Sequence, residues 1–189
     1  WTYSSRVQWI NSTYLNDDTD ALAAQVGAED TTMSVNAALK AAKFQDVEGL
    51  SAETTRKLDK LRGGIVLPAP TTDGAATELS GIATKLQSSY GKGKGTLNGQ
   101  PINGSDIEAA MGTNRDPDEL KEMWTSWHSQ VGGPMKDDYV RLVEIANQGA
   151  KELGFADVGA MWRSGYDMPA DDFAKLTDKL WSQVKPLYN

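Results

Sequence analysis

Few residues in this sequence are of the types that most often carry enzyme chemistry. It contains one histidine, His128, and no cysteine. A nucleophilic triad would have a single possible base, and a histidine-rich metal site cannot be assembled from this chain. His128 also lacks a His-Glu-x-x-His context, so no zincin motif is present. We interpret His128 as a surface or helix-packing residue, with a general base as the alternative.

Carboxylates are plentiful, and three adjacent pairs stand out: Asp17-Asp18, Asp137-Asp138 and Asp171-Asp172. Such pairs could serve acid–base chemistry or bind calcium. All three lie near expected helix starts, where negative charge complements the helix dipole. Capping and solvation are therefore the preferred interpretation, and we expect no metal site in this chain.

Arginine and tryptophan offer other kinds of chemistry. Arg163 lies beside Trp162 in a short segment that Asp157 can cap. An arginine in that position can anchor an anion, although a simple salt bridge is the more ordinary explanation. Four tryptophans stand at helical spacing with aliphatic partners, which favours core packing over a ligand cage. They are Trp124, Trp127, Trp162 and Trp181.

Composition limits the partners. The 189 residues carry a formal net charge of -7, and 39% are hydrophobic, as in an ordinary globular protein that folds. The excess of acid argues against nucleic acid or an anionic membrane as a partner. No run approaches the roughly 20 apolar residues of a membrane span, and the amino terminus lacks the apolar core of a signal peptide.

Two triplets, Asn11-Ser12-Thr13 and Asn103-Gly104-Ser105, fit the acceptor pattern for N-glycosylation. Such triplets also arise by chance, and the sequence leaves both interpretations open. A glycan would require a eukaryotic secretory source.

The elements that must position these residues have the spacing of helices. Apolar residues recur at helical intervals almost throughout, and no alternation of period two extends over a strand, so the predicted fold class is all-α. Helices are predicted at about 4–15, 16–43, 51–63 and 73–90. The segment at about 91–105 is rich in glycine, lysine and asparagine and is predicted to be an exposed loop or small hairpin.

Boundaries are clearer in the second half. Asp116 and Pro117 start a helix that is predicted to end at Gly132-Gly133-Pro134. The next helix closes at Gly154, and Pro169 opens the last one. The last helix has an apolar stripe that we expect to be buried. It consists of Phe173, Leu176, Leu180, Trp181 and Val184.

Three stretches, taken together, carry a family resemblance. They are Arg115–Leu120 running into Trp124–His128, then Gly154–Tyr166, then Leu180–Tyr188. In order and spacing they resemble the angiotensin-converting-enzyme family of zinc peptidyl-dipeptidases. Residues 9–19 look like the amino-terminal helices of that family, so the resemblance spans the chain.

The resemblance implies a fold. Members of that family are large, mostly helical ellipsoids split by a deep cleft, with the amino-terminal helices as a lid. Residues 1–189 would then be the amino-terminal third of a single larger domain, forming the lid and part of one wall. The family's zinc ligands and general base lie beyond the end of this sequence, so the remainder of the polypeptide would hold the zinc. The chain by itself is predicted to be inactive.

Site residues also follow from the resemblance. Arg163, in a Trp-Arg-Ser motif, resembles a ligand of an activating chloride ion. Trp9, Asn11 and Asn16 would face the cleft as lid residues. Gly165 stands where better-known members carry a large residue, which weakens the chloride assignment. The 91–105 segment lacks the cysteines that animal members bridge there, so the chain resembles a bacterial-type, exported member whose signal peptide is absent from this sequence.

The implied function is the release of carboxyl-terminal dipeptides from oligopeptides by the full protein. The apolar helix stripes of this chain, the last one above all, would pair with helices of the remaining polypeptide, as in an obligate interface. The alternative is a non-catalytic helical module of the same fold that binds peptides or another protein.

Overall fold

The computed structural model describes residues 2–188, which are mostly helical. The bounds are α1 Thr2–Thr13, α2 Asp17–Ala42, α3 Ala52–Gly63, α4 Ala75–Lys92, β1 Lys94–Leu97, β2 Gln100–Asn103, α5 Gly104–Thr113, α6 Pro117–Trp127, η1 His128–Gly132, α7 Gly133–Glu152, α8 Val158–Arg163, α9 Ala170–Val184 and η2 Lys185–Leu187. None of the helices within these residues is long and apolar enough to cross a membrane.

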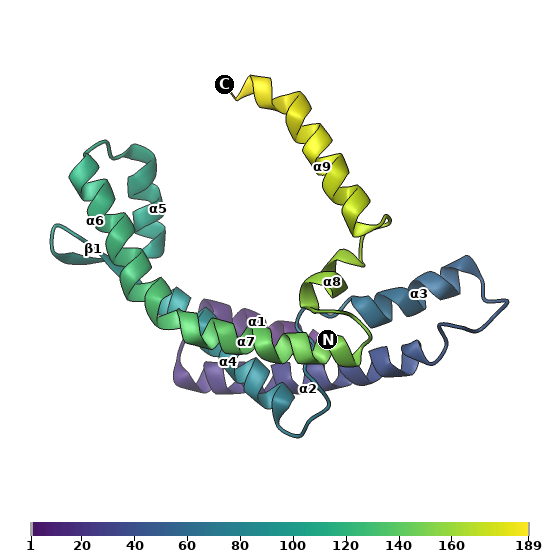
Figure 1. The fold of residues 1–189 in the computed structure, drawn as a ribbon. Coiled ribbons are helices and arrows are strands. Elements are labelled where there is room, and N and C mark those ends of the chain that lie inside the picture. Colours follow the sequence, from purple (N-terminus) through teal and green to yellow (C-terminus); the bar gives the residue numbers. More distant parts are fainter. Residues whose placement is uncertain (1, 189) are drawn as a thin grey trace.

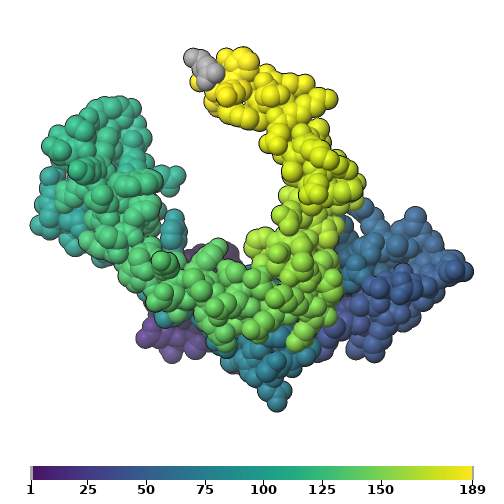
Figure 2. All heavy atoms as spheres, viewed as in Figure 1, coloured from purple at the N-terminus to yellow at the C-terminus, as the bar shows by residue number. Residues whose placement is uncertain are grey.

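The chain has a base and two arms (Figure 1). Helices α1, α2, α4 and α7 form the base, and α3 lies beside the end of α2. One arm consists of α6, α5 and the β1–β2 hairpin, and the other consists of α8 followed by α9. The space-filling view shows an open hollow between the two arms (Figure 2).

Side-chain caps fix several helix starts at the predicted positions. At α2, the Asn16 side chain accepts a hydrogen bond from the Thr19 amide at 2.9 Å, and the Thr19 hydroxyl accepts one from the Asn16 amide at 3.2 Å. Ser51 and Asp157 cap α3 and α8. Gly154 closes α7 with a φ of 87°, the left-handed conformation that glycine adopts at helix ends.

A two-stranded hairpin corrects the all-α fold class and confirms the hairpin alternative for the 91–105 segment. β1 and β2 are antiparallel with Leu97 opposite Gln100, which leaves Asn98-Gly99 as a two-residue turn. Both turn residues have positive φ, 52° and 73°, as the favoured Asn-Gly hairpin turn requires. Strands of 4 residues are too short to reveal an alternating pattern. The helix α5 that follows was not predicted.

The predicted helix end at Gly132-Gly133-Pro134 is wrong. The backbone stays helical from α6 through η1 into α7. η1 is a single π-helical turn, in which the Gly133 amide donates to the His128 carbonyl. Pro134 has no backbone N–H to donate to the preceding turn. A π-helical turn accommodates a proline here, because it changes which carbonyls of the preceding turn accept hydrogen bonds. The arm of α6 is therefore a direct extension of α7.

Two buried clusters lie in the base and at its junction with α8. One cluster joins α2, α7 and α8 and contains Ala38, Ala146, Ala150, Leu153, Val158 and Met161. A second joins α4 and α7 and contains Ala69, Leu79, Leu86, Leu142 and Ile145. At Gly149 of α7, an added Cβ would overlap the Pro68 backbone, so glycine is what lets this helix pass so close to the connection between α3 and α4.

The last apolar stripe is not buried within the described chain. No residue of α9 is buried, and Leu180 and Trp181 are each 50% exposed. Tyr166 stacks on Phe173 with ring centroids 4.2 Å apart, which anchors only the first turn of α9. The helix is amphipathic as expected, but within residues 2–188 no element covers its apolar face (Figure 1).

The tryptophans are less buried than predicted. Trp124, Trp162 and Trp181 are exposed, whereas Trp127 is half-buried and meets Tyr90 edge-on at 5.5 Å. The indole N–H of Trp162 donates to the Val66 carbonyl at 2.6 Å. The core is built instead from alanine and aliphatic side chains.

Candidate functional site

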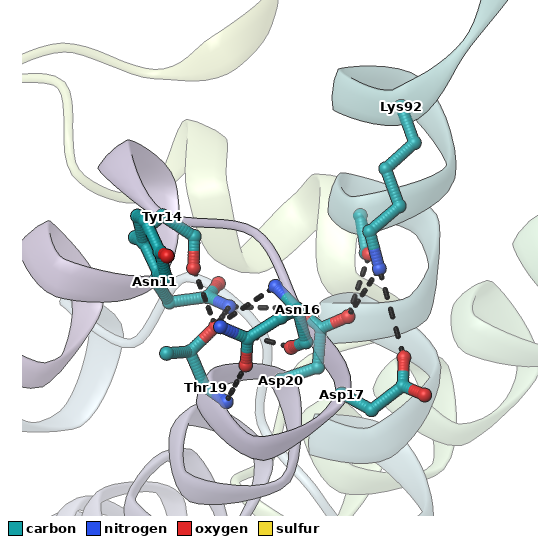
Figure 3. Close-up of polar contacts among 8 residues, drawn as sticks. Asn11, Tyr14, Asn16, Asp17, Thr19, Asp20 and Lys92 are labelled. Atoms are coloured by element: carbon teal, nitrogen blue, oxygen red, sulfur yellow. Dashed lines mark hydrogen bonds and ion pairs between the residues drawn. The ribbon is translucent and has the colours of Figure 1, made fainter.

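A polar cluster joins the two amino-terminal helices to α4 (Figure 3). Asp20 is its centre. One carboxylate oxygen accepts a hydrogen bond from the Asn11 amide at 2.7 Å, and the other accepts from the Ser88 hydroxyl at 2.6 Å and the Lys92 ammonium at 3.1 Å. Asp17 lies 3.9 Å from the same ammonium. The cluster therefore ties α1 and α2 to α4.

The electrostatics of the cluster keep Asp20 ionised. Burial alone raises the pKa of the Asp20 carboxyl, but the hydrogen bonds from Ser88, Asn11 and Lys92 outweigh burial and hold the pKa below its ordinary value. Asn11 is 1% exposed, and among the described residues its side-chain oxygen has no hydrogen-bond partner. We interpret the cluster as a structural tether, because the Asp20 carboxylate and the Asn11 side-chain nitrogen are used in contacts between helices.

The three predicted lid residues have different surroundings. Trp9 is 68% exposed on α1. Asn11 and Asn16 come together at Thr19, where Asn11 donates to the hydroxyl at 3.3 Å and Asn16 forms the helix cap. Both asparagine side chains are thus used in contacts between or within helices. A role for these three residues at a cleft stays a prediction.

The two possible glycosylation sites also have structural roles. Asn11 is buried and its amide nitrogen is bonded to Asp20, so this fold leaves no room for a glycan there. Asn103 is exposed and caps α5, with its side-chain oxygen accepting from the Asp106 amide at 2.9 Å. The Asn11 triplet is therefore a chance match to the acceptor pattern.

Arg163 is the last residue of α8, and its side chain is exposed. In the part of the chain that the structure describes, no carboxylate pairs with its guanidinium, so the ordinary salt-bridge explanation finds no partner there. The guanidinium keeps its donors available to an anion. Chloride binding by Arg163 stays a prediction.

His128 lies on the ring of Trp124, with centroids 4.0 Å apart, and its Nδ1 is 2.7 Å from the Trp124 carbonyl oxygen. This geometry fits the helix-packing interpretation. Across residues 2–188, no group of three His, Cys, Asp or Glu side chains is placed to hold a metal ion. The described residues therefore do not supply a donor set for zinc.

Apolar surface is the other feature of the described chain. A groove of about 540 Å³ borders the π-helical turn and is lined mainly by Trp127, Val131, Met135, Tyr139 and Val140. The α9 stripe exposes Leu176, Leu180, Trp181 and Val184 on one helix. Faces of this kind are typical of surfaces that another protein segment covers.

The chain is thus a helical protein with exposed apolar faces and an exposed arginine, Arg163. The sequence profile of the angiotensin-converting enzyme family matches residues 1–189, and the chain belongs to this family. It is 30% identical over 154 residues to the angiotensin-converting enzyme-like protein Ace3 of Mus musculus, covering 79% of this chain and 20% of that protein.

Two further relatives extend the comparison. The angiotensin-converting enzyme of Haematobia irritans exigua is 25% identical over 194 residues, covering 98% of this chain and 30% of that protein. The inactive angiotensin-converting enzyme-related protein of Caenorhabditis elegans is 34% identical over 89 residues, covering 44% of this chain and 10% of that protein. The chain thus spans a third or less of the length of these curated relatives.

Proposed function

We propose that this chain is the amino-terminal part of a zinc peptidyl-dipeptidase, an enzyme that releases dipeptides from the carboxyl ends of oligopeptides. The observation that carries the proposal is the family match over residues 1–189, combined with coverage of only 20% and 30% of two relatives. The chain supplies lid helices and part of one wall. Zinc and the general base belong to the remainder of the polypeptide, since the described residues form no metal-binding group.

The exposed face of α9 supports this division of the enzyme. Four large apolar side chains of one short helix are between 38% and 50% exposed. Covering such side chains is favourable by roughly 25 cal/mol for each Å² of apolar surface. In the proposed enzyme, helices of the remaining polypeptide cover this face, as in an obligate interface.

The proposal gives two groups of this chain a role. The Asp20 cluster holds α1 and α2 against α4, so the amino-terminal helices keep a fixed position relative to the base. Arg163 presents an exposed guanidinium at the end of α8, where it would bind the activating chloride. Neither group takes part in proton transfer or metal binding.

The direct test compares the full-length protein with this chain alone. We expect zinc, and chelator-sensitive release of a dipeptide from a blocked tripeptide, in the full-length protein only. Zinc content is measured by elemental analysis and release by chromatography. A full-length protein with neither zinc nor activity would contradict the proposal.

The chloride role has its own test. In the full-length enzyme, Arg163→Ala should raise the chloride concentration needed for half-maximal activation. Arg115→Ala is the control, because Arg115 is also exposed but donates to the carbonyls of Asn114 and Gly112. An unchanged chloride profile in Arg163→Ala would remove chloride binding from the proposal and leave the peptidase assignment standing.

A non-catalytic helical module is the second candidate. The relative from Caenorhabditis elegans that is named inactive favours it. Intact mass and sequencing of the source protein distinguish the two, because a His-Glu-x-x-His segment supports the enzyme. Peptide binding without cleavage, in a protein lacking that segment, supports the module.

A bacterial-type origin and export are further parts of the proposal. They rest on the resemblance and on the sequence of the 91–105 segment, which contains no cysteine. Cell fractionation of the source organism tests export: we expect the protein outside the cytoplasm, and a cytoplasmic protein would contradict it.

A further inference from the structure

The tip of the hairpin carries a sequence with its own reactivity. Asn98-Gly99 is the turn between β1 and β2, and both residues are exposed. An Asn-Gly pair is prone to spontaneous deamidation, because glycine has no side chain to hinder attack by its backbone nitrogen on the asparagine side chain. The same hairpin region contains a second pair, Asn103-Gly104, which provides an internal comparison.

The reaction needs no cofactor and balances with water alone. The Gly99 nitrogen loses its proton and bonds to the Asn98 side-chain carbonyl carbon, whose bond to Nδ2 breaks, and ammonia leaves with the proton. Water then opens the cyclic imide to aspartate or isoaspartate. The step therefore requires that the backbone nitrogen of Gly99 can lose its proton and that the side-chain amide of Asn98 can turn toward this nitrogen.

Two carboxylates of α6 hold both of these groups. The Glu122 carboxylate accepts two backbone hydrogen bonds. One oxygen accepts from the backbone N–H of Asn98 at 2.9 Å, and the other accepts from the backbone N–H of Gly99 at 3.2 Å. The Asn98 side-chain nitrogen donates to Glu119 at 2.9 Å. A carboxylate next to the Gly99 N–H opposes its deprotonation, because two negative charges would then be adjacent.

We propose that Asn98 is a deamidation site and that Glu119 and Glu122 of α6 keep it inactive by clamping the hairpin tip. Reaction at Asn98 replaces a donor to Glu119 by a third carboxylate, so an attractive contact becomes a repulsive one. Isoaspartate also lengthens the backbone by one methylene in a turn that has room for two residues. The modification thus releases the tip from α6 irreversibly.

Asn103 is held by a different group. Its side-chain oxygen accepts from the Asp106 backbone at 2.9 Å, and its side-chain nitrogen donates to the Asp106 carboxylate at 2.7 Å. These contacts form the cap of α5 and involve neither Glu119 nor Glu122. Removing the clamp at the tip should therefore leave the rate at Asn103 unchanged.

The test measures aspartate and isoaspartate at both sites by peptide mapping and mass spectrometry, in full-length protein incubated in mildly alkaline buffer. Glu122→Ala should raise the rate at Asn98 by roughly tenfold, the factor expected when charge-assisted hydrogen bonds to a carboxylate are lost. Asp106→Ala is the matched control and should raise the rate at Asn103 alone.

A second variant, Glu119→Ala, removes only the contact to the Asn98 side chain within the clamp and should give a smaller rise at Asn98. Equal deamidation rates at Asn98 in the wild-type protein, Glu119→Ala and Glu122→Ala would overturn the proposal. An equal rise of the deamidation rate at Asn98 and Asn103 in Glu119→Ala and Glu122→Ala would overturn it as well, because that pattern indicates general unfolding.

Discussion

Helices α7 and α9 carry the same kind of apolar stripe but have different surroundings. In α7, Leu142 and Ile145 are buried against α4. In α9, Leu180 and Trp181 project from an arm that no other described helix covers (Figure 1). Periodicity thus identifies the apolar face of a helix. Periodicity does not show whether the same chain also contains the surface that buries this face, because that depends on the tertiary structure.

Truncation of one aliphatic side chain in each helix should give the largest difference. Ile145→Ala leaves a cavity in the base and should lower the free energy of unfolding of the isolated chain by about 2–5 kcal/mol. Leu180→Ala removes a side chain that is already 50% exposed and should cost little in the same chain. Urea unfolding measures both. An equally large loss from Leu180→Ala in the isolated chain would contradict the difference between the two helices.

Two glycine substitutions test how closely the helices of the base pack. Gly149→Ala should destabilise by about 1–3 kcal/mol, because its Cβ meets the Pro68 backbone, which cannot move aside as a flexible side chain would. Gly81→Ala in α4 is the control: no atom lies near its added Cβ, so it should stabilise by about 0.5–1 kcal/mol. Thermal unfolding measures both, and a shift of the same sign for both variants would contradict the close approach at Gly149.

The Asp20 cluster should have a smaller, pH-dependent effect. Because the pKa of Asp20 is lower in the folded chain, its stabilisation is present above about pH 4 and is lost as the pH falls through the folded-state pKa. Asp20→Asn should cost about 1 kcal/mol at neutral pH and weaken this acid dependence. Urea unfolding as a function of pH measures both effects. Asp18→Asn, at an exposed position, is the control, and equal acid profiles for wild type and Asp20→Asn would contradict the tether.

Local signals predicted much of the fold. The helix starts at Asn16, Ser51 and Asp157 and the closure at Gly154 each depend on a few neighbouring residues, and each occurs close to its predicted position. The π-helical turn was missed, because Gly132-Gly133-Pro134 is an ordinary stop signal under the rules for an α-helix.

The candidate site was less predictable than the helices. Asp20 meets Ser88 and Lys92 across 68 and 72 residues of sequence, and no local pattern in a single sequence reports such a pairing. Asn11 was singled out as a lid residue, yet its buried hydrogen bond to Asp20 gives it a structural role that sequence spacing did not suggest. The hairpin clamp was missed for the same reason, since Glu122 and the Asn98 turn are separated by 24 residues.

In the proposed enzyme, the remainder of a larger peptidase covers the α9 face. Amide hydrogen exchange of the isolated chain and of the full-length protein tests it most directly. We expect the amides of α9 to exchange quickly in the isolated chain, where those of α7 are protected, and to become as slow as α7 in the full-length protein. Slow exchange of α9 in the isolated chain, or fast exchange in the full-length protein, would contradict the claim.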